Sequence, residues 1–136
     1  MPKRILVIDD SEDLRIVVSD RLRRMGFEVL AESNGLEGLS RILLMWDQGR
    51  PLHGILLDLD MPFLDGIAVL QELRARRLQI PVVVMTASQE PGEREKCLAL
   101  GAHDYLAKPF HGEDLQEVCL RIFGIGILDE PKETGL

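Results

Sequence analysis

The apolar positions of the chain follow two patterns that alternate along its whole length. Short continuous apolar runs are typical of strands buried on both faces of a sheet. These runs lie at residues 5–8, 27–31, 53–57, 81–85 and 105–106. Between them, apolar residues recur every three or four positions, which is typical of helices with one buried face. Five strands that alternate with five helices predict an α/β fold, in which helices cover both faces of a parallel sheet.

Charged side chains stand where three of the apolar runs end. Asp9 and Asp10 follow the first run, Asp58 follows the third, and Lys108 and Pro109 follow the fifth. Because the carboxyl ends of parallel strands lie at one edge of a sheet, we expect these charges to converge. Folding does not require such a cluster, since neighbouring buried carboxylates repel unless a cation is present. The pattern therefore predicts a site for a divalent cation and a phosphoryl group.

Each of these residues also has a simpler interpretation. Asp9 and Asp10 could serve only to cap the first helix, because Asp is favoured at that position, although Ser11 could do the same. Asp58 could be a solvated loop acid. Lys108 could be an ordinary surface lysine.

Length and composition narrow the possible classes of protein. A chain of 136 residues is the usual size of one domain with a single core. Its net charge of −7 argues against direct binding to nucleic acid or to anionic membranes. Residues 1–4 lead into a four-residue apolar run, too short for a signal peptide, and no apolar stretch reaches the ~20 residues of a membrane span. We therefore expect a cytoplasmic protein, with Cys97 and Cys119 as buried thiols.

Several motifs occur together, in order and at the expected strand ends. They are Asp9-Asp10, residues 56–62, Asp65-Gly66, Thr86-Ala87 and residues 101–110. Together they resemble a response-regulator receiver domain of two-component signalling over roughly residues 3 to 123. The resemblance implies a flavodoxin-like, doubly wound sheet of five parallel strands in the order 2-1-3-4-5 with five helices. We accordingly expect a receiver domain at residues 1–123, and a tail or the start of a linker at residues 124–136.

The resemblance also assigns roles to the acidic residues. Asp58 would be the phosphoacceptor, supplied by a histidine kinase or a histidine phosphotransfer protein. Mg²⁺ would be held by Asp9 and Asp10, by the Asp58 carboxylate and by the backbone carbonyl of Asp60. The chemistry is consistent, because Mg²⁺ prefers oxygen ligands and Asp can form an acyl phosphate. The free carboxylate of Asp60 adds negative charge beside this site, so we expect altered dephosphorylation and stronger dependence on metal.

Three further residues receive roles from the same resemblance. Thr86 and Lys108 would contact the phosphoryl oxygens, and Tyr105 would act with Thr86 as the switch. We expect the Tyr105 hydroxyl to move from solvent toward the interior. Pro109 makes a cis peptide bond inexpensive, and the resemblance points the same way, so we predict a cis Lys108–Pro109 bond. On phosphorylation, the surface formed by the fourth helix, fifth strand and fifth helix would change shape. A downstream protein partner or effector domain would bind the changed surface.

Other functions remain open at this stage. The Asp58-Leu59-Asp60 sequence is also the nucleophile motif of haloacid-dehalogenase-type phosphatases, but Pro62 stands where those motifs have Thr or Val. The chain could also be a receiver that is never phosphorylated and only binds partners. A flavin carrier would need a phosphate loop rich in hydroxyls and glycine, whereas residues 9–13 are acidic. If the receiver prediction holds, the chain is no enzyme and catalyses only its own phosphorylation and dephosphorylation.

Overall fold

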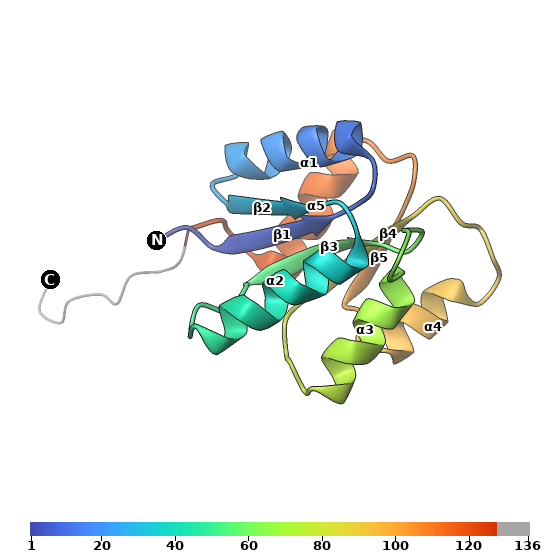
Figure 1. The fold of residues 1–136 in the computed structure, drawn as a ribbon. Helices are drawn as coiled ribbons and strands as arrows, with labels where there is room; N and C mark the ends of the chain where they lie inside the picture. Colours follow the sequence, from blue (N-terminus) through green and yellow to red (C-terminus); the bar gives the residue numbers. More distant parts are fainter. Residues whose placement is uncertain (128–136) are drawn as a thin grey trace, which may run out of the picture.

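Two layers of helices enclose a parallel sheet in the computed structural model, which describes residues 1–127 (Figure 1). The strands are β1 (Arg4–Ile8), β2 (Glu28–Glu32), β3 (Gly54–Asp58), β4 (Val82–Thr86) and β5 (Asp104–Ala107). They pair in parallel in the order β2-β1-β3-β4-β5. The predicted fold class and strand order are confirmed.

Helices follow each strand and begin at the positions that the sequence favours. They are α1 (Glu12–Arg24), α2 (Gly35–Asp47), α3 (Gly66–Ala75), α4 (Glu93–Ala99) and α5 (Gly112–Phe123). Ser11, Asn34 and Asp65 cap α1, α2 and α3, since each side chain accepts a hydrogen bond from a backbone N–H in the first turn. Ser11 thus provides the cap for α1, and Asp9 and Asp10 are not needed for it.

The strands β2, β3 and β4 begin and end one residue later than the apolar runs predicted. The pairing with neighbouring strands continues past the last apolar side chain, since Asp58 still pairs with Met85 and Thr86 with Ala107. Asp58 and Thr86 are therefore the last residues of β3 and β4. Their positions are set by the sheet, which is more rigid than a loop.

The core consists of two apolar clusters, one on each face of the sheet. One cluster lies between the sheet and α2, α3 and α4, and the other lies between the sheet and α1 and α5 (Figure 1). Cys97 belongs to the first and Cys119 to the second, and both are buried free thiols as predicted. Because β1, β3 and β4 are covered on both faces, their carboxyl ends are held firmly.

The segment after α5 turns back to the start of the chain. The Lys3 amide donates to the Gly126 carbonyl at 2.6 Å, and Pro2 bridges Ile127 in antiparallel fashion. The predicted tail therefore begins with a docked segment at residues 124–127, while its residues 128–136 lie outside the described part. No helix within residues 1–127 has the length and apolar character needed to cross a bilayer.

Candidate functional site

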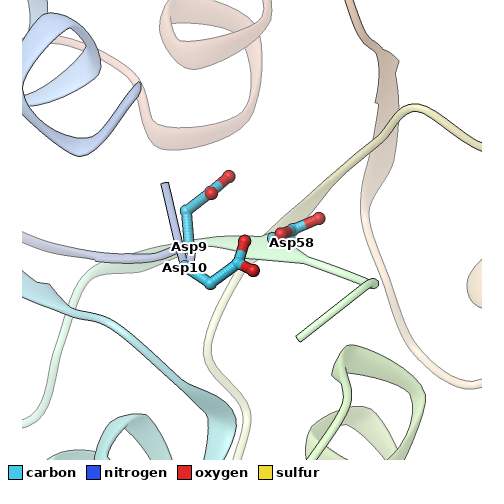
Figure 2. Close-up of side chains that lie close together, drawn as sticks. All are labelled: Asp9, Asp10 and Asp58. Carbon is cyan, nitrogen blue, oxygen red and sulfur yellow. The ribbon is translucent and has the colours of Figure 1, made fainter. Parts of the chain in front are cut away.

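Three carboxylates meet at the carboxyl edge of the sheet. Asp9 and Asp10 follow β1, and Asp58 ends the neighbouring strand β3, with which β1 pairs through Ile8 and Leu57. One oxygen from each of the three carboxylates lies within 4.8 Å of the others (Figure 2). The predicted convergence of these side chains is confirmed. A cluster of hard oxygen ligands at this spacing fits a divalent cation such as Mg²⁺.

Asp9 is held in place by several hydrogen bonds. It is fully buried, and its Oδ1 accepts a hydrogen bond from the Ser11 amide at 2.9 Å. The Lys108 ammonium donates to Asp9 Oδ2 at 2.8 Å, and Arg15 Nη1 donates to the Asp9 carbonyl at 2.7 Å. Our sequence analysis missed Arg15, because nothing in its spacing distinguishes it from the other arginines of α1. Asp9 is therefore a fixed part of the site.

Lys108 links the fifth strand to these acids. Its amide donates to the Thr86 carbonyl at 2.7 Å, and the Lys108–Pro109 peptide is cis, as predicted. Its Nζ lies 3.4 Å from Asp58 Oδ1 in addition to its bond with Asp9. Burial alone would lower the pKa of Lys108, but the hydrogen bond to Asp9 and the charge of Asp58 raise it above its ordinary value. Lys108 is therefore a cation that two carboxylates share.

Asp58 occupies the centre of the site. The residue is only 3% exposed, and its Oδ1 accepts a hydrogen bond from the Asp60 amide at 3.2 Å. Burial, and next the charge of Asp9, raise the pKa of Asp58 to about 6, although Lys108 and the Asp60 amide act in the opposite direction. The positive charge of Lys108 and the Asp60 hydrogen bond thus do not fully offset the cost of burying the Asp58 carboxylate beside Asp9. A further cation would stabilise the negative charge of that carboxylate.

The loop after β3 is closed tightly beneath Asp58. The Gly66 amide donates to the Leu59 carbonyl at 3.1 Å. A Cβ at Gly66 would lie 2.5 Å from the Asp58 carbonyl oxygen, so only glycine allows this approach. The Asp65-Gly66 pair therefore caps α3 and closes the loop at the same time.

Thr86 and Tyr105 lie on the neighbouring strands β4 and β5. Thr86 is fully buried, and its Oγ1 accepts a hydrogen bond from the Ser88 amide at 3.0 Å. The Tyr105 hydroxyl donates to Glu93 Oε1 at 2.7 Å and to the Ser88 carbonyl at 3.4 Å. Burial and the hydrogen bond to Glu93 raise the pKa of Tyr105. The hydroxyl is therefore hydrogen-bonded to the first turn of α4, and the sequence carries no signal for this partner.

Comparison with known proteins identifies the architecture around these residues. The family model described as "Response regulator receiver domain" matches residues 5–119. The alkaline phosphatase synthesis transcriptional regulatory protein PhoP of Bacillus subtilis is 38% identical over 110 residues, which are 81% of this chain and 44% of that protein. The transcriptional regulatory protein PrrA of Mycobacterium tuberculosis is 40% identical over 107 residues, covering 79% of this chain and 44% of the relative. The chain thus spans less than half the length of these relatives.

Solved structures of related proteins share the fold of this chain. The chemotaxis protein CheY4 of Vibrio cholerae superposes with a TM-score of 0.78 at 27% identity, covering 90% of this chain and 99% of the other. The BeF3-activated receiver domain of DrrB superposes with a TM-score of 0.75 at 25% identity, covering 89% and 97%.

Proposed function

The chain belongs to the response regulator receiver domain family, and from this membership we propose that it takes up a phosphoryl group on Asp58 in a Mg²⁺-dependent reaction. The observation that carries the proposal is the cluster of Asp9, Asp10 and Asp58 at one sheet edge, with Lys108 against two of them. The donor would be a histidine kinase or a histidine phosphotransfer protein, because these are the donors in two-component signalling. The chain would catalyse only its own phosphorylation and dephosphorylation. This proposal replaces the alternative of a haloacid-dehalogenase-type phosphatase, which the Asp58-Leu59-Asp60 motif had left open.

The residues of the site fit Mg²⁺. Asp9, Asp10 and Asp58 supply clustered carboxylate oxygens, and the Asp60 backbone carbonyl is proposed as a further ligand. When bound, Mg²⁺ would neutralise the charge of these acids and of the incoming phosphoryl group. The raised pKa of Asp58 supports this assignment, because the protein's own groups leave that carboxylate short of positive charge.

The transfer itself needs little from the protein beyond position and charge. An Asp58 oxygen would form a bond to phosphorus while the bond from phosphorus to the donor's imidazole nitrogen breaks. Lys108 Nζ, already 3.4 Å from Asp58 Oδ1, would donate to a phosphoryl oxygen as a compact positive charge. Thr86, at the end of the adjacent strand, would donate its hydroxyl to another phosphoryl oxygen, an interaction that exists only in the phosphorylated state.

The same conditional bond supports a switch. If Thr86 moves toward the phosphoryl group, its Oγ1 gives up the Ser88 amide, and space opens beside β4. Tyr105 could enter that space only by leaving Glu93. Phosphorylation would thus release the first turn of α4 and change the surface formed by α4, β5 and α5. A downstream protein partner or an effector domain would read this surface.

We propose that the donor is a protein and that the transfer takes place in the cytoplasm. The surface beside the acids supports a protein donor. Ile16 and Val17 of α1 are 59% and 64% exposed. A groove of about 600 Å³ runs between α1 and the β5–α5 loop and is lined by Val17, Pro109 and Phe110 among others. Exposed apolar side chains that gather beside a polar site are typical of a surface that another protein covers. Since the relatives are named as transcriptional regulators, we propose that the output of the pathway is transcription, with no direct contact of this domain with nucleic acid or membrane.

Labelling with a small phosphodonor tests the phosphoacceptor. We expect acetyl phosphate with Mg²⁺ to add one phosphoryl group by mass, and Asp58→Asn to abolish the addition. Asp47→Asn is the matched control, because Asp47 is an exposed acid at the end of α2. Undiminished labelling of Asp58→Asn would overturn the assignment.

Thermal unfolding tests the metal. Mg²⁺ should raise the melting temperature of the unphosphorylated protein, because a ligand that binds only the folded state stabilises it. Asp10→Asn should weaken this effect markedly. Equal melting curves in millimolar Mg²⁺ and in chelator would count against the metal site.

Amide chemical shifts test the switch. We expect a phosphoryl mimic with Mg²⁺ to shift the amide resonances of residues 87–110 and to change the Tyr105 rotamer. Thr86→Ala should suppress these changes while leaving labelling of Asp58 possible. Unchanged activated shifts in Thr86→Ala would refute the coupling.

A further inference from the structure

One residue in the loop that follows Asp58 combines a left-handed backbone with an exposed aromatic ring. Phe63, in the loop between β3 and α3, has a φ of +69° and a side chain that is 84% exposed. The left-handed region is costly for residues with a Cβ, and a bulky aromatic residue there is uncommon. Exposure means that the ring gains little from burial in return. Phe63 therefore carries both a strained backbone and a large apolar surface in water.

One other non-glycine residue in residues 1–127 has a left-handed backbone, and its conformation belongs to a helix ending. Arg77 has a φ of +58° directly after α3. Its amide donates to the Arg74 carbonyl at 3.1 Å, and the Leu78 amide donates to the Leu73 carbonyl at 3.0 Å. These bonds are those of a common helix ending, which requires a left-handed residue at this position. Phe63 ends no helix and is instead the central residue of a tight turn, in which the Leu64 amide donates to the Pro62 carbonyl at 2.9 Å. A turn of this kind with a positive φ at its centre is rare and strained.

The surrounding loop holds Phe63 outward. The loop is closed at its base by the bond between Gly66 and Leu59. Met61 and Leu64 pack against the core cluster of α2, α3 and α4. The Leu64 carbonyl oxygen lies so close to α2 that a Cβ at Gly35 would be 1.9 Å from it. With its neighbours anchored inward, Phe63 has no route into the core.

Two other apolar residues in this part of the chain are exposed. Pro62 beside Phe63 is exposed, and so is Leu36 in the first turn of α2, next to the Gly35 that contacts this loop. The carboxylates of Asp10 and Asp60 are exposed as well. A partner that fits would therefore present an apolar pocket bordered by basic side chains.

We propose that Phe63 is a specificity-determining anchor for the protein that donates the phosphoryl group. The proposal rests on the proposed function. A donor histidine has to reach the Asp58 carboxylate, which ends β3, and the loop that holds Phe63 follows directly from it. A donor that covers this end of the sheet, together with the groove between α1 and the β5–α5 loop, is therefore within reach of Phe63. Aromatic side chains are the usual anchors of protein interfaces. The strained backbone presents the ring before the partner arrives, which reduces the entropic cost of docking.

Two kinds of phosphodonor separate docking from chemistry. The protein donor is the cytoplasmic portion of a histidine kinase, autophosphorylated with labelled ATP and chosen from a panel because it transfers to the wild-type chain. The small donor is acetyl phosphate. The variants are Phe63→Asn, which tolerates a left-handed backbone and removes the ring, and Phe63→Trp, which keeps an aromatic anchor. Leu44→Asn is the control, since Leu44 is 56% exposed on the later part of α2.

We expect Phe63→Asn to lower kcat/KM for transfer from the kinase by about tenfold or more, through KM rather than kcat. Its labelling by acetyl phosphate should match the wild type, and its melting temperature should be equal or higher because the strain is relieved. Phe63→Trp should stay close to wild type, and Leu44→Asn should be unchanged with both donors.

Three outcomes would overturn the proposal. The first is an unchanged kcat/KM for the kinase with Phe63→Asn. The second is an equal loss with acetyl phosphate, which would show that the loop acts on the chemistry itself. The third is a wild-type dimer in sedimentation that Phe63→Asn dissociates while kinase transfer is unaffected, which would assign the surface to a second copy of the chain. Labelling that persists in Asp58→Asn would instead contradict the proposed function, so the two failures are distinguishable.

Discussion

Titratable side chains at the two edges of the sheet differ in the hydrogen-bond and charge partners that they have. At the amino edge, His53 Nδ1 accepts a hydrogen bond from the Arg4 amide at 2.9 Å, and His103 Nδ1 accepts one from the Val82 amide at 3.3 Å. Each ring is matched to one backbone donor of a neighbouring strand. At the carboxyl edge, by contrast, Asp9 and Asp58 share one ammonium group, that of Lys108. Each histidine of the amino edge thus accepts one backbone hydrogen bond, whereas the carboxyl edge buries two carboxylates with one cation between them, which costs stability.

The pKa shifts at the two edges have opposite consequences. Burial and the charge of Asp9 raise the pKa of Asp58 to about 6, so folding favours its protonated form and the carboxyl edge gains stability as pH falls from 7 toward 4. Burial, and next the charges of Arg4 and Lys3, lower the pKa of His53, so folding favours the neutral ring. The amino edge therefore loses stability as pH falls below the ordinary histidine pKa of 6.5.

Removing the shared cation should have the largest effect. Lys108→Met leaves Asp9 and Asp58 buried without a counter-charge, and we expect the free energy of unfolding at pH 7 in chelator to fall by about 3 kcal/mol. Urea denaturation measures the change. Lys96→Met, at an exposed lysine of α4, is the control and should change little. Equal stability of Lys108→Met and wild type would show that the carboxyl edge is not under charge strain.

Removing the central carboxylate should act in the opposite direction. Asp58→Asn keeps the shape and removes the charge that burial penalises, so we expect a gain of about 2 kcal/mol at pH 7 without Mg²⁺. The gain should shrink as pH falls toward 4, where wild-type Asp58 becomes protonated in the folded state. Urea denaturation at several pH values tests this. A loss of stability in Asp58→Asn would contradict the cost that we assign to the charge.

The amino edge can be tested by replacing its histidine with an acceptor that does not titrate. His53→Asn places an amide oxygen where Nδ1 accepts from Arg4, so stability at pH 7 should change by no more than about 1 kcal/mol, the usual contribution of one hydrogen bond. Below pH 6.5 the wild type should lose stability that the variant keeps. The double variant with Asp58→Asn should show neither pH dependence. If His53→Asn leaves the acid side of the stability profile unchanged, the histidine does not titrate as proposed.

The smallest expected effect compares the two left-handed residues. Arg77→Gly replaces a residue with a Cβ at a helix ending that favours glycine, so we expect a gain of up to about 1 kcal/mol. Thermal unfolding measures it, and phosphotransfer from the kinase should be unchanged. If Arg77→Gly also lost phosphotransfer from the kinase, a change at a left-handed residue outside the β3–α3 loop would affect transfer. That result would contradict the assignment of a specific docking role to Phe63.

The fold and the centre of the site could be read from the chain because both depend on local patterns. Apolar runs and helical spacing reflect burial on two faces or on one, so the alternation of elements followed directly. The charges at Asp9, Asp58 and Lys108 stood at the ends of runs, and parallel strands bring such ends together. The exact strand limits did not follow, because pairing extends to polar residues such as Asp58 that periodicity assigns to loops.

Other parts of the site depended on contacts between distant elements. The partner of Tyr105 is Glu93, twelve residues away on another element, and an acid in a first turn of a helix is common without such a role. The matched histidines of the amino edge depend in the same way on which backbone amides the neighbouring strands present.

The cis Lys108–Pro109 peptide was predicted partly from the family resemblance. By itself, the sequence determined the alternating fold, the acidic cluster and the lysine beside it. Each of these follows from residue type and position along one strand or turn. The tertiary structure alone decided the docking of residues 124–127, the bond between Tyr105 and Glu93, and the outward, left-handed Phe63. These features depend on contacts between segments that are distant in the sequence, and a local sequence pattern does not specify such contacts.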